Sequence, residues 1–263
     1  MDLQLEGKRA LVTGASRGLG YATAQRLAQE GCDLTINSRT LETLETAAQT
    51  LAAESGRTVI PLAGDVADPE TPTGLIEKTV AALGGLDLLV TNAGGPPAGA
   101  FESFDEQTWQ HSVELSFLSH VRLIRAALPY LRQSDIASVL TVTSYSVKQP
   151  IPNLVLSNSV RAATVGLTKT LALELGEDGI RFNSILPGWT KTERVTNLMK
   201  HRAEAKGTSI EVEIKKQAED SPLGRMAEPE EFANAAAFLL SPAAGYITGT
   251  MLCVDGGMYK GTL

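Results

Sequence analysis

Residues 13–20 carry the pattern that decides the fold, a glycine-rich turn that follows a short apolar run directly. They read Thr13-Gly14-Ala15-Ser16-Arg17-Gly18-Leu19-Gly20. Glycines let the backbone turn tightly and approach a phosphate, and a helix that begins here points its first N–H groups at the anion. A glycine-rich turn alone is a weak signal, but its place between a predicted strand and a predicted helix indicates a dinucleotide phosphate site.

Short aliphatic or β-branched runs alternate with segments of helical period along the chain. The predicted strands are Arg9–Thr13, Asp33–Asn37, Thr58–Leu62, Leu86–Thr91, Ser138–Thr143, Ile180–Leu186 and Met251–Val254. The predicted helices are Gly18–Glu30, Leu41–Glu54, Thr73–Leu83, Asp105–Arg132, Val155–Leu175 and Pro229–Leu240. This alternation predicts an α/β fold: a single doubly wound Rossmann-type domain over residues 1–263, with a seven-stranded parallel sheet and helices on both faces.

A polar, charge-rich insertion at about residues 193–220 interrupts the alternation. Insertions at strand ends of such sheets often cover the site, so we expect a short helical lid here. A solvated helical hairpin would give the same sequence pattern.

Composition argues against several classes of partner. The 23 Lys and Arg against 30 Asp and Glu give a net charge of −7, which disfavours nucleic acid or an anionic membrane. No apolar run is long enough to span a bilayer, and the N-terminus does not resemble a signal peptide. Cys32 and Cys253 are expected as buried thiols rather than a disulfide or metal site, so we expect a cytoplasmic protein without a metal.

Further motifs occur in order behind the predicted strands, and with the glycine turn they make the chain resemble the short-chain dehydrogenase/reductase family. They are Asp65-Val66, Asn92-Ala93-Gly94, Pro187-Gly188 with Thr190 and Thr192, Pro222-Leu223-Gly224-Arg225, Ile247-Thr248-Gly249 and Asp255-Gly256-Gly257. The last three resemble the ketoacyl carrier-protein reductases in particular. The resemblance implies that the cofactor is bound by Gly14, Ser16, Arg17, Gly18, Leu19, Gly20, Asp65, Val66, Asn92, Ala93, Gly94, Pro187, Gly188, Thr190 and Thr192.

The end of the second predicted strand indicates which nicotinamide cofactor is preferred. An NAD-preferring relative usually has an acidic residue there, whereas this chain has Ser38 and Arg39. Ser38 can donate a hydrogen bond to a 2′-phosphate, Arg39 a charge-assisted one, and Arg17 supplies a second cation. We therefore predict NADP(H), with surface arginines of no special role as the alternative.

The stretch from Ser144 to Arg161 corresponds to the catalytic segment of the family. The resemblance places the family's carbonyl-orienting serine at Ser144, its proton-donating tyrosine at Ser157 and its lysine at Arg161. The family's helix asparagine falls on Ser116. A serine hydroxyl lacks the phenol's pKa of about 10, and arginine is too basic to pass a proton along a relay.

Two hypotheses follow from this departure. The first is an NADP(H)-dependent oxidoreductase that acts on a small carbonyl or alcohol substrate, such as an acyl-thioester ketone, with catalytic residues Ser144, Ser157 and Arg161 and a proton from Tyr145, His201, Lys191 or water. The second is a catalytically inactive NADP(H)-binding protein that serves as a sensor or partner subunit. Intact nucleotide motifs are compatible with both.

The predicted central helix, Asp105–Arg132, has apolar residues on more than one side. Val113, Phe117, Val121, Ile124 and Leu128 form one stripe, and Leu115 and Leu118 lie off it. One face should meet the sheet and another a second subunit or a long loop. Together with the family resemblance, this predicts a homotetramer.

Overall fold

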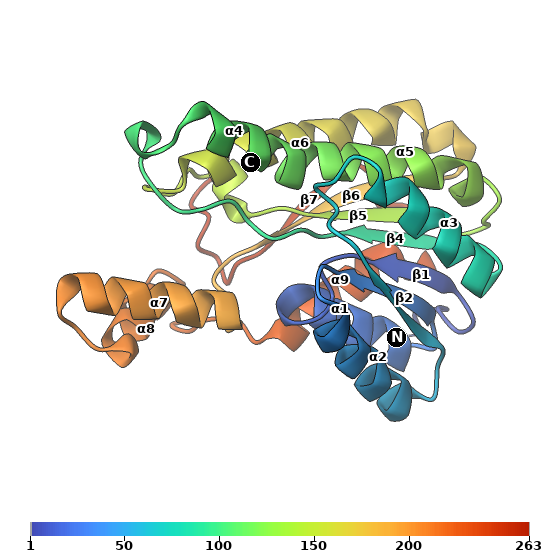
Figure 1. Ribbon diagram of the computed structural model, residues 1–263, viewed down its shortest axis with the longest axis horizontal. Helices are drawn as coiled ribbons and strands as arrows, with labels where there is room; N and C mark the ends of the chain where they lie inside the picture. Colours follow the sequence, from blue (N-terminus) through green and yellow to red (C-terminus); the bar gives the residue numbers. More distant parts are fainter. Residues whose placement is uncertain (1, 263) are drawn as a thin grey trace.

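Seven parallel strands form one sheet in the order β3-β2-β1-β4-β5-β6-β7 (Figure 1). The computed structural model describes residues 2–262. The strands are β1 Arg9–Val12, β2 Asp33–Ser38, β3 Val59–Ala63, β4 Leu88–Thr91, β5 Ser138–Val142, β6 Arg181–Pro187 and β7 Met251–Val254. The prediction of a doubly wound α/β fold with seven parallel strands is confirmed, and each predicted strand lies within two residues of an observed one.

Helices cover the sheet on both faces, and successive strand residues point to opposite faces, so each strand contributes to two cores. Ala10 and Val12 of β1 enter a core with helices α1, α2 and α9, and Leu11 enters a second core with α3, α5 and α6. The helices are α1 Gly18–Gln29, α2 Leu41–Ser55, α3 Thr71–Leu83, α4 Glu106–Val113, α5 Ser119–Leu131, α6 Val155–Glu174, α7 Glu193–Lys206, α8 Ile210–Glu219 and α9 Pro229–Leu240. Figure 1 shows the two helical layers on opposite sides of the sheet.

The central helix differs from the prediction of one continuous element. A π-helical turn over Glu114–Leu118 separates α4 from α5 and shifts the helical faces. The fully buried face of α5 carries Leu123, Ile124 and Ala127, whereas Val113, Phe117 and Val121 of the predicted stripe are only half-buried. The helix therefore has a second apolar face, which is half-buried and formed by Val113, Phe117 and Val121 of the predicted stripe.

The insertion is a helical hairpin formed by α7 and α8, which projects from the body in Figure 1. Its inner side packs into a third apolar cluster. The buried members are Tyr145, Leu186, Trp189, Met199, Met226 and Met258. The carboxylate of Glu213 accepts hydrogen bonds from Lys206 Nζ and Thr208 Oγ1 at 2.8 and 2.9 Å, and so holds the two helices together at their turn.

The glycine turn interlocks with the segment after β4. Thr13 Oγ1 donates to Asn92 O at 2.7 Å and accepts from Asn92 N at 2.9 Å, and Asn92 Nδ2 donates to Gly14 O. A Cβ on Gly14 would lie 2.9 Å from Asn92 O, and one on Gly20 would lie 2.2 Å from Gly14 O. Close packing of backbone on backbone thus requires glycine at both positions, independently of any ligand.

Replacing Gly20 by alanine should destabilise the protein by about 1–3 kcal/mol, because the new methyl group overpacks against backbone that cannot move away. The matched control is Gly74→Ala in α3, where a Cβ meets nothing within 4 Å. That change should stabilise by up to about 1 kcal/mol through helix propensity. Urea unfolding midpoints measure both. Equal midpoints for the two variants would contradict the interlock as a steric constraint.

Candidate functional site

The carboxyl ends of the strands gather the predicted cofactor residues at one edge of the sheet. The glycine turn is tied to the end of β2 because Ala15 N donates to Asn37 O at 2.9 Å. This bond holds the glycine turn, which contains Ser16 and Arg17, against the end of β2, where Ser38 and Arg39 lie. Ser38 is half-buried, and both arginines are solvent-exposed.

The shape of this edge fits a dinucleotide. Gly18 has φ +61 at the start of α1, and a Cβ there would meet only the Thr192 methyl group, at 3.6 Å. A Cβ on Gly94 would meet nothing within 4 Å, so the backbone there borders open space, whereas Gly18 faces the Thr192 side chain at an ordinary contact distance. Thr190 is 2% exposed, and its Oγ1 has no hydrogen-bond partner among residues 2–262. An unsatisfied buried hydroxyl beside a backbone cradle is what a polar ligand would complete.

Gly188 has a packing role that is separate from the cofactor contact that the resemblance implied. Its N–H donates to Val254 O at 2.9 Å, and an added Cβ would lie 2.7 Å from Asp255 Cα. The glycine therefore lets the end of β6 pack closely against the chain after β7. This contact explains the residue without a cofactor.

The first turn of α7 reaches across this edge. Thr192 caps the helix by accepting a hydrogen bond from Val195 N. Glu193 forms an exposed ion pair with Arg17, 2.6 Å between Nη1 and Oε2. Arg194 lies over Gly95, where both of its Nη atoms would be 2.3 Å from an added Cβ, and donates to Pro96 O. The insertion therefore contacts both the glycine turn and the loop after β4.

The predicted catalytic serines lie on different elements. β5 ends at Val142, and Ser144 caps a 3₁₀ turn over Tyr145–Val147 by accepting from Ser146 N at 3.2 Å. Ser157 lies in the first turn of α6, half-buried, and its hydroxyl has no side-chain hydrogen bond among the described residues. Both hydroxyls are free to donate to a ligand.

Arg161 is buried one turn further along α6, with 7% of its surface exposed. Its Nη1 donates to Val142 O and Thr143 O at 3.1 and 3.2 Å, so the guanidinium is anchored to the end of β5 next to Ser144. Burial, with a smaller contribution from the charge of Arg194, lowers the pKa of Arg161 to about 10. The side chain stays cationic at neutral pH, in a place that disfavours its charge.

Sequence reasoning missed a buried histidine beside this arginine. His120 of α5 is 1% exposed, its Nδ1 lies 2.6 Å from Thr91 Oγ1, and its Nε2 has no partner among residues 2–262. Burial, followed by the charge of Arg161, lowers its pKa to about 3. Ser116, at the family's asparagine position, also has a buried and unpartnered Oγ. From sequence, only the phase of the predicted helix could have grouped Ser116 with His120. The π turn changes that phase, so the grouping could not be predicted.

The three residues that we considered as replacement proton donors differ in their surroundings. His201 is 79% exposed and lies 3.7 Å from Glu204, and Lys191 is half-exposed and paired with Glu228. Tyr145 is 8% exposed and packs in the cluster under the insertion, where burial is the main cause of its raised pKa. Ser144 and Tyr145 both follow the end of β5, so the alternation of side chains along a strand does not apply to them.

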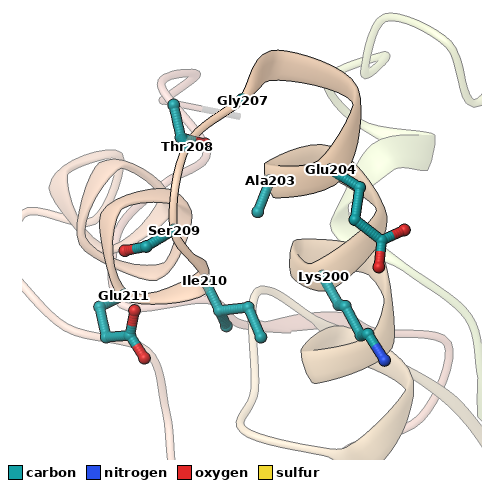
Figure 2. Close-up of a pocket in the computed structure, with 8 residues that line it drawn as sticks. All are labelled: Lys200, Ala203, Glu204, Gly207, Thr208, Ser209, Ile210 and Glu211. Carbon is teal, nitrogen blue, oxygen red and sulfur yellow. The ribbon is translucent and has the colours of Figure 1, made fainter.

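Two hollows border the insertion. One, of about 460 Å³, adjoins the catalytic segment and is lined by Tyr145, Gln149, Pro150, Ile151, Pro152, Glu219, Asp220, Pro222, Met258 and Lys260. The other, of about 430 Å³, opens at the α7–α8 turn, where Figure 2 shows Lys200 and Glu204 opposite Ile210 and Glu211. The α7–α8 turn, which borders this second hollow, lies at the end of the hairpin away from the sheet (Figure 1). The first is the better placed to receive a substrate.

Other classes of site find no support in residues 2–262. No group of three or more His, Cys, Asp or Glu side chains there could hold a metal ion. No helix of that part is long and apolar enough to cross a membrane. Cys32 is a buried free thiol as expected, whereas Cys253 is only partly buried.

A parallel doubly wound sheet with a glycine turn at its center and polar loops along one edge defines a nucleotide-binding α/β protein. Comparison with known proteins identifies the family. A family profile described as "Enoyl-(Acyl carrier protein) reductase" matches residues 14–259. The chain belongs to the short-chain dehydrogenase/reductase family, a family of NAD(P)-dependent oxidoreductases.

Individual relatives match over almost the whole chain. Dehydrogenase/reductase SDR family member 4 of Bos taurus is 33% identical over 96% of this chain and 88% of its own length. L-sorbose reductase from Gluconobacter frateurii, solved with NADPH and L-sorbose, superposes with a TM-score of 0.96 at 34% identity and covers 99% of this chain and 100% of its own. The actinorhodin polyketide ketoreductase variant F189W, solved with NADPH, gives a TM-score of 0.91 at 30% identity over 97% of this chain and 98% of its own.

The low pKa of His120 predicts a pH dependence of stability. The unfolded chain takes up a proton near pH 6.5 and the folded chain does not until about pH 3, so stability falls as pH drops below 6.5. Between pH 7 and 5, wild type should lose about 2 kcal/mol more of its unfolding free energy than His120→Gln, at about 1.4 kcal/mol per pH unit. Chemical unfolding of both proteins at several pH values measures this. Parallel pH profiles would contradict a buried neutral histidine.

Proposed function

We propose that this protein is an NADP(H)-dependent oxidoreductase with a non-standard active site, acting on a small molecule with a carbonyl or hydroxyl group. The bound cofactor would supply or accept the hydride. The observation that carries the proposal is the cofactor edge, where the glycine turn meets the first turn of α7 at Gly18 and Thr192, and the loop after β4 borders open space at Gly94. Solved relatives that contain NADPH, such as L-sorbose reductase, support the same cofactor here.

The preference for NADP(H) rests on the cations at the end of β2. Arg39 is exposed and forms no ion pair among residues 2–262, so its guanidinium is available to a 2′-phosphate. Arg17 is held by Glu193, so a phosphate has to compete with that carboxylate. The pair is exposed, and such pairs contribute at most about 1 kcal/mol, so the doubly charged phosphate should win.

In the proposed active site, Ser144 orients the substrate oxygen and Ser157 donates a second hydrogen bond to it. Arg161 supplies positive charge at the side of α6, where its remaining donors, Nε and Nη2, have no protein partner among the described residues. A serine cannot deliver the proton as the missing phenol would, so we assign that proton to water. His201 and Lys191 face other partners, and Tyr145 lies under the insertion.

The inactive NADP(H)-binding protein remains the second candidate, favoured by the absence of a placed acid.

We propose a single domain over residues 1–263, a lid at about 193–220, a cytoplasmic location and a homotetramer. The half-buried stripe of Val113, Phe117 and Val121 supports association through the central helix. Exposed Leu173 on α6 adds apolar surface on a second helix of the same layer.

Replacing Arg39 by glutamine should weaken NADPH binding by about 10- to 100-fold, the value of one charge-assisted hydrogen bond to a phosphate. NADH binding to the same variant serves as the internal control and should change little, because NADH has no 2′-phosphate. Fluorescence titration of the free protein measures both constants. Wild type that binds NADH as tightly as NADPH would refute the cofactor assignment.

Activity is tested with NADPH and a panel of ketones that includes neutral and acidic members. We expect wild type to oxidise NADPH slowly with at least one ketone. Ser157→Tyr/Arg161→Lys should be faster by roughly 10²- to 10⁴-fold, the usual contribution of a placed general acid. A wild type without turnover, beside an active double variant, would favour the binding protein over the enzyme.

A further inference from the structure

Three side chains between the sheet and helices α5 and α6 keep a buried polar atom without a partner. The atoms are Ser116 Oγ, His120 Nε2 and Thr143 Oγ1, on residues that are 1%, 1% and 3% exposed. None of them has a hydrogen-bond partner among residues 2–262. Buried polar groups in native proteins are almost always satisfied, by protein or by ordered water, so each of the three indicates an occupant.

Hydrogen bonds from the sheet to both helices form the floor of the space that these atoms border. Thr91 of β4 and Thr141 of β5 are direct neighbours in the sheet register. His120 Nδ1 of α5 lies 2.6 Å from Thr91 Oγ1, and Thr168 Oγ1 of α6 lies 3.0 Å from Thr141 Oγ1. Two adjacent threonines therefore anchor one helix each.

The two helices close the space above that floor. Thr168 Oγ1 donates to Thr164 O at 2.8 Å, and Thr164 Oγ1 donates to Ser116 O at 2.7 Å. Ser116 lies in the π turn, four residues before His120, so the two side chains lie on the same side of the central helix. A continuous ring of contacts thus runs from His120 through the sheet to α6 and back through Ser116.

The space opens toward the catalytic segment. Thr143 N still donates to β6 at 3.0 Å, so its side chain follows the alternation of β5 and points to the same face as that of Thr141. Arg161, one turn before Thr164 on α6, donates to Thr143 O at 3.2 Å. Ser144 is the next residue. The space therefore ends beside the place that we assign to the substrate oxygen.

The bond to Thr91 determines which imidazole nitrogen of His120 carries the hydrogen. Among residues 2–262 the Thr91 hydroxyl has no acceptor other than His120 Nδ1. It therefore donates to Nδ1, which leaves the hydrogen of a neutral imidazole on Nε2. Burial lowers the pKa of His120 to about 3, so the ring is neutral at neutral pH. The unpartnered Nε2 is then a hydrogen-bond donor.

We propose that His120 Nε2, Ser116 Oγ and Thr143 Oγ1 hold a buried water, and that His120 positions this water to protonate the substrate oxygen at Ser144. A buried water typically makes about three hydrogen bonds, which is the number of unpartnered atoms around this space. The inference rests on the proposed function, which assigns the proton to water. The family resemblance gave His120 no role.

The proton transfer balances without a further acid. As the carbonyl carbon accepts the hydride, one O–H bond of the water breaks, and its proton forms the O–H bond of the alcohol. The hydroxide that remains accepts a hydrogen bond from His120 Nε2 and is stabilised by the Arg161 guanidinium until solvent returns a proton. The imidazole stays neutral throughout.

A crystal structure of the full-length protein with NADPH tests the water site without any need for turnover. We expect an ordered water within hydrogen-bond distance of His120 Nε2 in wild type, and its loss in His120→Leu. A dry Nε2 in wild type would overturn the inference at any level of activity.

Kinetics with NADPH and the best ketone of the panel test what the water does. His120→Leu removes the donor, and kcat should fall roughly 10²-fold, the usual cost of one donor at a developing charge. KM and NADPH affinity should stay within about threefold, because the contact matters in the transition state. The solvent isotope effect on kcat should rise, since proton transfer becomes limiting, whereas a general loosening of the structure would leave it unchanged. His120→Gln keeps a donor and should recover most of the loss.

Two further variants complete the series. Ser119→Ala is the matched control, because Ser119 is as buried as His120 and its hydroxyl already donates to Leu115 O. Its kcat should stay within about twofold of wild type. Ser116→Ala removes a second contact to the water and decides the matter if His120→Leu does not fold. It should lose roughly three- to tenfold in kcat, the value of one neutral hydrogen bond, with the same rise in isotope effect.

Unchanged kcat and isotope effects in His120→Leu, or in Ser116→Ala where it takes its place, would overturn the positioning role. Failure of the proposed function gives a different signature. A wild type that holds the water and never oxidises NADPH keeps the water site and loses both the oxidoreductase assignment and the proton delivery. A wild type that turns over with a dry Nε2 keeps the enzyme and loses the inference.

Discussion

The contact between Thr13 and Asn92 is the constraint on which the site depends. β1 and β4 are neighbours at the center of the sheet, where the direction of the strand order reverses, and such sheets open a crevice there. Thr13 and Asn92 exchange hydrogen bonds at 2.7 and 2.9 Å across this point. Their bonds fix the glycine turn against the loop after β4, and Gly14 and Gly20 have to be glycine for the two segments to fit.

Much of this arrangement could be predicted from sequence because it is periodic or backbone-determined. Strands with both faces buried read as aliphatic runs, and their ends were placed within two residues. Parallel topology then brings all loops that follow the strands to one edge, so the motif residues from Ser16 to Thr192 could be grouped without coordinates. The glycines were predicted from their approach to a phosphate. Close packing of the backbone also accounts for Gly14 and Gly188.

The remainder depended on tertiary contacts that no local pattern carries. The π turn over Glu114–Leu118 changes which residues of the central helix face inward, so the pairing of His120 with Thr91 was invisible. Strand β5 ends at Val142, a residue earlier than predicted, and the turn that follows sends Tyr145 under the insertion. A long side chain such as Arg194 is directed by its neighbours, and its position over Gly95 follows from the docking of α7.

The cofactor edge and the catalytic segment tolerate substitution differently. Phosphate contacts at the glycine turn would be made by backbone N–H groups, which a change of side chain leaves in place. The proton donor and its lysine partner are side chains, and at the positions that the resemblance assigns to them this chain has Ser157 and Arg161 in an unchanged fold. Arginine keeps the charge of the lysine, yet its guanidinium reaches Val142 and Thr143 and remains buried there.

That anchored charge determines what the altered site can still do. In the proposed site the proton comes from water, so the site has to stabilise the negative charge on an oxygen held at Ser144 until that proton arrives. A buried guanidinium is suited to that task, because its attraction for an anion is screened less than in water.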